Sequence, residues 1–222
     1  MLRSNNVLMF SLAVSIFGIF TTAFFAFNPT AYDFSFTWRK PLVGAVFAAI
    51  CVAGMLAAFR PKTCSHILDQ HDIYDEQPAN PKEKTSYRGH HPDCGRFSAH
   101  VVHVKDMTFC AACLGLAVGA FFALAGTAVY FFCGIDFVQA DARILLAGQT
   151  AVVLGLMQFK LKGYFRLLLN SLFVIGGFMA LTEVDKLTAN VLIDIYVIAV
   201  ITVWIFTRII LSQWDHQRIC DA

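Results

Sequence analysis

The chain has 222 residues, of which 58% are hydrophobic and only 14% are charged. Its mean hydropathy is +0.63, far from the balance of a soluble globular domain, so lipid is the solvent for most of the chain. The formal net charge of +2 is too small to indicate a nucleic-acid partner. We therefore expect a protein of the cell membrane, with the lipid bilayer as its first partner and a second copy or another membrane protein as further candidates.

Six apolar runs approach the length of about 20 residues that a helix needs to cross about 30 Å of hydrocarbon. They cover residues 7–27, 41–59, 109–133, 143–159, 164–181 and 191–212. The fourth run is the shortest and contains Gln149 and Gln158, so it would be the first to be dropped if only five helices spanned. Uninterrupted runs favour helices over barrel strands. The sequence predicts an all-α, polytopic transmembrane helical bundle of about six spans.

The first run has some features of a secretory signal peptide, because Arg3 precedes it and Ala23 and Ala26 lie near its end. Its apolar stretch is longer than the usual core of about 7 to 15 residues. We therefore expect a retained helix; cleavage would leave the rest of the topology unchanged.

Lysine and arginine predict the orientation, because cytoplasmic loops accumulate them. With six spans, the side that holds both termini and the segment 60–108 carries thirteen of the seventeen basic residues: Arg3, Arg60, Lys62, Lys82, Lys84, Arg88, Arg96, Lys105, Lys160, Lys162, Arg166, Arg208 and Arg218. The opposite side has Arg39, Lys40, Arg143 and Lys186. Both termini are predicted to be cytoplasmic.

The chain divides into two helices in 1–59, a Cys/His-rich cytoplasmic loop domain in 60–108, and four helices with a short tail in 109–222. The orientation places all seven histidines and five of the seven cysteines on the cytoplasmic side. Cys51 and Cys133 are the other two, and we interpret them as packing residues. A loop of this length is too short for a large core, so a metal staple is expected, and the reducing cytoplasm disfavours a disulfide.

Candidate zinc ligands gather at the end of this loop. Cys110 and Cys113 can turn two thiolates toward one ion, and a third cysteine with a histidine would close a tetrahedron. Cys94 lies 16 residues upstream of Cys110, and His91 and His100 flank it. The predicted Zn²⁺ site comprises Cys94, Cys110 and Cys113 with either His91 or His100, and the choice of histidine stays open.

Three alternatives compete with a closed structural site. Cys110 and Cys113 open a helix, where the helix N-terminus favours a thiolate, so a membrane thiol oxidoreductase is one of them. The loop lacks the βαβ pattern expected around such a redox motif. Three protein ligands plus water would instead allow hydrolysis, and simple packing of these side chains is the third. The leading interpretation is a metal-stabilised scaffold, accessory subunit or sensor, with no catalytic residues assigned.

The motif region resembles a family of bacterial and archaeal integral membrane proteins of unknown function. That family has a Cys-Ala-Arg-Cys-Thr-Gly type segment leading into a transmembrane helix; here the segment is Cys110-Ala111-Ala112-Cys113-Leu114-Gly115. Upstream stands His90-His91-Pro92-Asp93-Cys94-Gly95-Arg96-Phe97, a form similar to the archaeal branch. The sequence departs from the commoner form at Ala112 and Leu114. The resemblance covers about 30 residues and implies a fold and a shared motif but no activity.

Polar and small residues inside the spans give further predictions. Gly115 and Gly119 have the spacing that lets a neighbouring helix approach closely. Gln149 and Asn170 are expected to hydrogen-bond between helices. Glu183, Asp185 and Asp194 fall near the non-cytoplasmic ends of the last two spans, where they could serve a cation transporter. Surface ion pairs with Lys186 and Arg143 are the favoured interpretation of these carboxylates.

Overall fold

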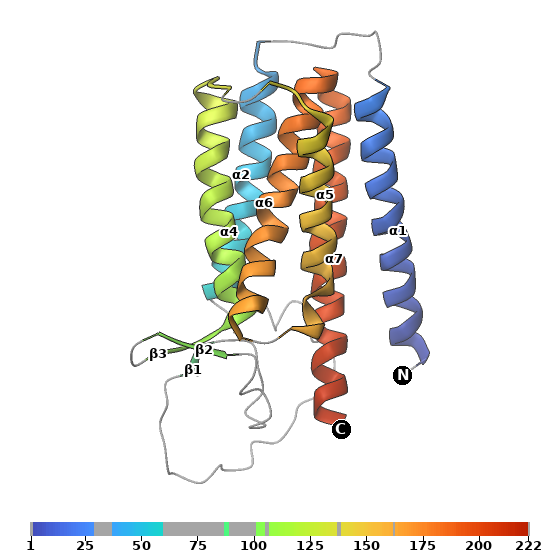
Figure 1. The fold of residues 1–222 in the computed structure, drawn as a ribbon, viewed down its shortest axis with the longest axis vertical. Helices are drawn as coiled ribbons and strands as arrows, with labels where there is room; N and C mark the ends of the chain where they lie inside the picture. The colour runs from blue at the N-terminus through green and yellow to red at the C-terminus, as the bar shows by residue number, and fades with distance from the viewer. Residues whose placement is uncertain are drawn as a thin grey trace.

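The computed structural model describes residues 2–28, 37–59, 87–88, 101–104, 107–136, 139–161 and 163–221. Six helices in these ranges lie side by side in one bundle (Figure 1). They are α1 (Leu2–Phe27), α2 (Arg39–Phe59), α4 (Ala111–Thr127), α5 (Ala142–Leu156), α6 (Gly163–Thr188) and α7 (Val191–Asp221). A π-helical turn, η2 (Ala128–Phe132), continues α4, and a 3₁₀ turn, η3 (Met157–Lys160), continues α5. The all-α bundle is confirmed.

Five of the helices are long and apolar enough to cross a membrane, and α5 is the shorter apolar one. The 15 residues of α5 and the four of η3 together extend about 30 Å at about 1.5 and 2.0 Å per residue. Both ends of the chain lie at the same end of the bundle (Figure 1), which requires an even number of traverses. The protein is a multi-pass membrane protein, and α5 with η3 supplies its sixth traverse.

The last two long helices extend beyond their apolar runs. The predicted fifth span ended at residue 181, whereas α6 continues to Thr188; the predicted sixth ended at residue 212, whereas α7 continues to Asp221. Hydropathy predicts an end to the span before Glu183-Val184-Asp185-Lys186, because three of these four residues are charged. Each of the charged side chains nevertheless has a partner inside the bundle, so the helix continues. The extra turn of α6 thereby carries carboxylates into the protein interior.

Helix α6 is the centre of the bundle. Its apolar window is 56% buried, against 22% for α1 and for α2, and it packs against α4 and α5. A Cβ on Gly119 would lie 2.6 Å from the carbonyl oxygen of Ser171, and one on Gly148 would lie 2.9 Å from that of Gly176. The predicted close approach at Gly115 and Gly119 is confirmed, and α6 is the neighbour.

Hydrogen bonds across the bundle join α1 to the other helices. Gln149 on α5 donates to the carbonyl oxygen of Ile19 at 3.0 Å, so its predicted interhelical role is confirmed. The indole of Trp204 on α7 donates to the carbonyl oxygen of Ser15 at 3.1 Å. The outer face of α1 exposes Phe10, Phe17, Phe20 and Phe24, as expected where acyl chains are the solvent.

A small sheet adjoins the end of the bundle at which α4 begins (Figure 1). Its strands are β1 (Tyr87–Arg88), β2 (Val101–Val104) and β3 (Met107–Cys110), in the order β1-β3-β2. β2 and β3 are antiparallel, and β1 and β3 are parallel. The sequence prediction contained no strands here. The rest of the predicted loop domain 60–108 lies outside the described residues.

Candidate functional site

Cys110 and Cys113 lie at the point where the sheet passes directly into the bundle. Cys110 is both the last residue of β3 and the N-cap of α4, with extended backbone angles (φ −65°, ψ 120°). Cys113 follows within the first helical turn, so both side chains return to one side of the helix. The two thiols lie within electrostatic range of each other, and Cys110 is 3% exposed. The structure thus brings together two of the predicted zinc ligands, Cys110 and Cys113.

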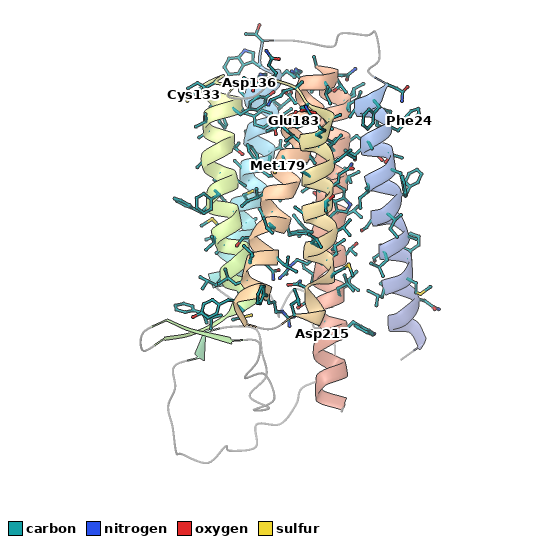
Figure 2. All side chains as sticks on the ribbon, viewed as in Figure 1. Phe24, Cys133, Asp136, Met179, Glu183 and Asp215 are labelled. Atoms are coloured by element: carbon teal, nitrogen blue, oxygen red, sulfur yellow. The ribbon has the colours of Figure 1, made fainter. Side chains whose placement is uncertain are left out.

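Two buried arginines lie within electrostatic range of the thiols. They are Arg166 in the first turn of α6 and Arg208 in α7. Arg208 donates from Nε and Nη2 to the side-chain oxygen of Asn170, at 2.9 and 2.6 Å. Arg166 donates from Nη2 to the carboxylate of Asp215 at 3.3 Å, and Figure 2 shows Asp215 at the end of the bundle nearest the strands.

We call this group the thiol–arginine cluster: Cys110, Cys113, Arg166, Asn170, Arg208 and Asp215. Its side chains come from the start of α4, the start of α6 and the second half of α7, so the packing of three helices determines its geometry. With neutral thiols it carries two positive formal charges and one negative. The two arginines favour a thiolate, which is the form of cysteine that binds metals or attacks a disulfide, whereas burial and the neighbouring thiol oppose it.

The two arginines of this cluster are not among the site residues predicted from the sequence. Arg166 and Arg208 were counted as cytoplasmic basic residues that report orientation, whereas both are buried in the bundle. The sequence did contain a signal that could have identified these arginines. Each arginine stands inside or at the edge of an apolar run, and a charged residue within a span is rarely without a role.

The other predicted zinc ligands, His91, Cys94 and His100, lie in the segment 89–100, outside the described residues. Within the part of the chain that the structure describes, no group of three or more His, Cys, Asp or Glu side chains could hold a metal ion. The zinc site therefore stays a prediction, of which only the Cys110–Cys113 pair has a described geometry.

The sheet determines where the segment 89–100 leaves and rejoins the described chain. Arg88 at the end of β1 pairs with Phe109, and Val101 at the start of β2 pairs with Cys110. β1 runs parallel to β3 and β2 runs antiparallel to it, so both flanking residues lie at the Cys110 end of β3. The twelve residues that contain His91, Cys94 and His100 are joined to the sheet at that end.

A second polar cluster occupies the opposite end of the bundle. Arg39 donates from Nη1 to Asp185 at 2.5 Å and to Asp194 at 2.6 Å, and the Tyr130 hydroxyl donates to the other oxygen of Asp185 at 2.5 Å. We call Arg39, Tyr130, Asp185 and Asp194 the carboxylate cluster. Asp185 and Asp194 are 1% and 0% exposed, so the predicted surface pairing of these two residues is wrong.

Glu183 and its partners surround the carboxylate cluster. Nζ of Lys186 lies 2.9 Å from Oε1 of Glu183 and 3.0 Å from Oδ1 of Asp136. Figure 2 shows Glu183 and Asp136 at this end of the bundle. The second oxygen of Glu183 accepts from the backbone N–H of Asp141 at 3.0 Å. The predicted pairing of Glu183 with Lys186 is confirmed, although Glu183 is only 2% exposed. Arg143 instead pairs with Asp141.

Asp141 also caps the N-terminus of α5, where its side chain accepts from the backbone N–H of Arg143 at 2.8 Å. Hydrogen bonds from the Arg143 side chain and backbone hold the pKa of Asp141 below its usual range.

Comparison with known proteins gives no relative: no family model, no curated protein and no solved structure matches the chain. The resemblance of the motif region to a membrane family stays a prediction, and function must be inferred from the two clusters.

Proposed function

We propose that this multi-pass membrane protein holds a structural zinc ion at the thiol–arginine cluster and serves as a scaffold, accessory subunit or sensor. Cys110 and Cys113 would supply two ligands and Cys94 a third, with a histidine of the segment 89–100 as the fourth. The observation that carries the proposal is the sheet register, because it joins both ends of that segment to the chain beside Cys110. When bound, zinc would fasten the segment to the bundle.

The register also favours one histidine over the other. His100 is bonded directly to Val101, and Val101 is the strand partner of Cys110. Consecutive Cα atoms are about 3.8 Å apart, and strand partners are about 4.5 to 5.5 Å apart. His91 is three residues beyond Arg88 and has no comparable constraint. We therefore infer that His100 is the fourth ligand.

Charge supports the same site. Zinc bound by three thiolates and one neutral imidazole carries a net charge of −1. Arg166, Arg208 and Asp215 together carry a formal charge of +1. The two sums cancel, which matters in the interior of a membrane protein because an uncompensated buried charge is expensive.

Metal analysis of the purified protein tests the proposal. We expect one zinc per chain in the wild type, loss of zinc in Cys94→Ser, Cys110→Ser and Cys113→Ser, and retention in Cys133→Ser, whose thiol is exposed at the far end of α4 and η2. His100→Ala should lose zinc and His91→Ala should keep it. A metal-free wild-type protein with an alkylation-sensitive thiol pair would overturn the proposal.

A membrane thiol oxidoreductase is the second candidate function. The observation that favours it is the proximity of the Cys110 and Cys113 thiols to each other and to two arginines. The same metal analysis separates the two functions, because a redox pair would be metal-free and would interconvert between dithiol and disulfide with a measurable reduction potential. Zinc that protects both thiols from alkylation would exclude this candidate.

We infer that the bundle end bearing the thiol–arginine cluster faces the cytoplasm. Without the buried Arg166 and Arg208, eleven basic residues still fall on that side, against four on the other. Cys133 is exposed at the opposite end, so a membrane-impermeant maleimide should label it in intact cells. Cys133→Ser should abolish that labelling. Labelling of Cys133 only after permeabilisation would show that the protein has the opposite orientation in the membrane.

A further inference from the structure

The carboxylate cluster places two aspartates of different helices against each other. Asp185 lies in the last turn of α6 and Asp194 in the first turn of α7. Only Ala189 and Asn190 separate the two helices, and Ala189 has a left-handed backbone (φ 48°) that closes the turn. Each of the two carboxyl groups has an oxygen within 2.6 Å of Nη1 of Arg39, so the groups lie close to each other. Two carboxylates offer only acceptors, so a hydrogen bond between these groups would need a proton on one of them.

A single guanidinium nitrogen serves both groups. Nη1 of Arg39 contacts one oxygen of Asp185 and one oxygen of Asp194. The hydroxyl of Tyr130 donates to the second oxygen of Asp185, so each oxygen of Asp185 accepts one hydrogen bond. Oδ1 of Asp194 is buried and has no hydrogen-bond partner among the described residues. A buried oxygen left in this state is costly unless it carries or accepts a proton.

The surrounding charges do not balance the pair. Among the described residues at this end, Arg39, Lys40, Arg143 and Lys186 are positive, and Asp136, Asp141, Glu183, Asp185 and Asp194 are negative. Lys186 is bound by Glu183 and Asp136, and Arg143 by Asp141. Lys40 lies over the ring of Tyr130, 4.3 Å from its centroid. The sum leaves one negative charge in excess. Two sets have more carboxylates than cations, namely Glu183 and Asp136 around Lys186 and the two aspartates around Arg39. Asp136 is exposed to solvent, whereas Asp185 and Asp194 are both buried, so the excess is costly at the pair that shares Arg39.

We propose that Asp185 and Asp194 form a proton-binding site, in which one proton on Oδ1 of Asp194 is shared with the carboxylate of Asp185. Binding converts one carboxylate to a carboxylic acid and releases no other group. The added positive charge makes the pair and Arg39 neutral together, and the new O–H gives Asp194 Oδ1 its missing hydrogen bond. A proton suits this site better than a metal ion, because a metal ion needs several oxygen ligands around it.

This site is independent of zinc, since it lies at the other end of the bundle from the thiol–arginine cluster (Figure 2). It would give the protein a proton-binding function on the opposite side of the membrane. Intramembrane carboxylates with one shared cation are a common basis for proton uptake and release.

Infrared spectroscopy of the full-length protein in lipid vesicles at neutral pH tests the site. A carboxylic acid has a C=O stretching band that a carboxylate lacks. We expect a band equivalent to one group per chain, shifted in deuterium oxide and in protein labelled with ¹³C at the aspartate carboxyl. Asp194→Asn and Asp185→Asn should each abolish the band, because either variant leaves one carboxylate for Arg39. Glu183→Gln is the matched control and should keep it, since Glu183 pairs with Lys186 rather than with Arg39.

Several results would overturn the proposal. A folded wild-type protein without the band has no such proton. A band that stays in both Asn variants belongs to another residue, and a spectrum that changes with sodium at constant pH indicates a metal ion instead. If an Asn variant fails to fold, the ¹³C-aspartate shift in the wild-type protein still decides whether an aspartic acid is present.

Discussion

Ser171 on α6 donates a hydrogen bond from its hydroxyl to the backbone carbonyl oxygen of Gly115 on α4, at 2.8 Å. Such a bond needs two helix backbones at close range, which is possible only where the facing residues are small. Gly119, one turn further along α4, faces the backbone of the same Ser171. The interface between α4 and α6 therefore depends on the absence of side chains at two positions.

Gly119→Ala should destabilise the protein by about 1–3 kcal/mol, because the new Cβ would lie 2.6 Å from the carbonyl oxygen of Ser171 and force the helices apart. Gly54→Ala is the matched control, since a Cβ there meets nothing within 4 Å. That variant should be neutral or more stable by up to about 1 kcal/mol. Denaturant unfolding in mixed micelles measures both, and equal effects at the two glycines would contradict the packing argument.

Arg208→Gln should weaken zinc retention by roughly 10- to 100-fold if the proposed site is present, because the variant removes a positive charge beside the thiolates. A chelator competition assay on the purified protein measures the change. Arg143→Gln is the control, since its side chain is 90% exposed at the other end of the bundle. Unchanged zinc affinity in folded Arg208→Gln would show that the arginine does not compensate the metal site.

Asp141 should make the stability of α5 depend on acid pH. Its pKa is lowered in the folded state by the hydrogen bonds from Arg143, from an ordinary value of 3.8. The unfolded chain thus binds more protons near that pH, so the contribution of Asp141 is complete above 3.8 and is lost as the pH falls further. Thermal unfolding of the wild type and Asp141→Asn should differ at neutral pH and converge in acid. A constant difference would contradict this origin.

Ala189→Gly should stabilise the protein by about 1 kcal/mol, because Ala189 adopts a left-handed backbone that glycine reaches without a steric penalty. Asn190→Ala should act in the opposite direction by about 1 kcal/mol, since the Asn190 side chain accepts from the backbone N–H of Leu192 at 2.9 Å and caps α7. The unfolding midpoints of the two variants, compared with that of the wild type, test both predictions. Destabilisation by Ala189→Gly would mean that the turn conformation is not strained.

Hydropathy was a good guide to the helices because a bilayer imposes one length on every span. The runs 7–27 and 41–59 match α1 and α2 closely, and the glycines of α4 identified its tight interface. The strands were missed because β2 and β3 have only four residues each, although Val101-Val102-His103-Val104 before a two-residue connection is a recognisable hairpin signal.

The partners of the buried charges could not be predicted from local sequence. Arg39 is 146 residues from Asp185 and 155 from Asp194, and nothing near Arg39 distinguishes it from an ordinary basic residue at a helix start. Sequence proximity favoured Lys186 as the partner of the carboxylates. The fold decides otherwise, because α6 continues beyond its apolar run and carries Asp185 inward, whereas Lys186 reaches Glu183 instead.

Helix α6 carries part of both clusters, with Arg166 and Asn170 toward one end and Asp185 toward the other. Asn170 and Asp185 are about 22 Å apart along its axis at about 1.5 Å per residue. A continuous helix is stiff over that length, and close glycine contacts hold it on two flanks. Any axial displacement or rotation of this rod at one membrane surface must therefore appear at the other, so the helix has the mechanical form of a transmission element.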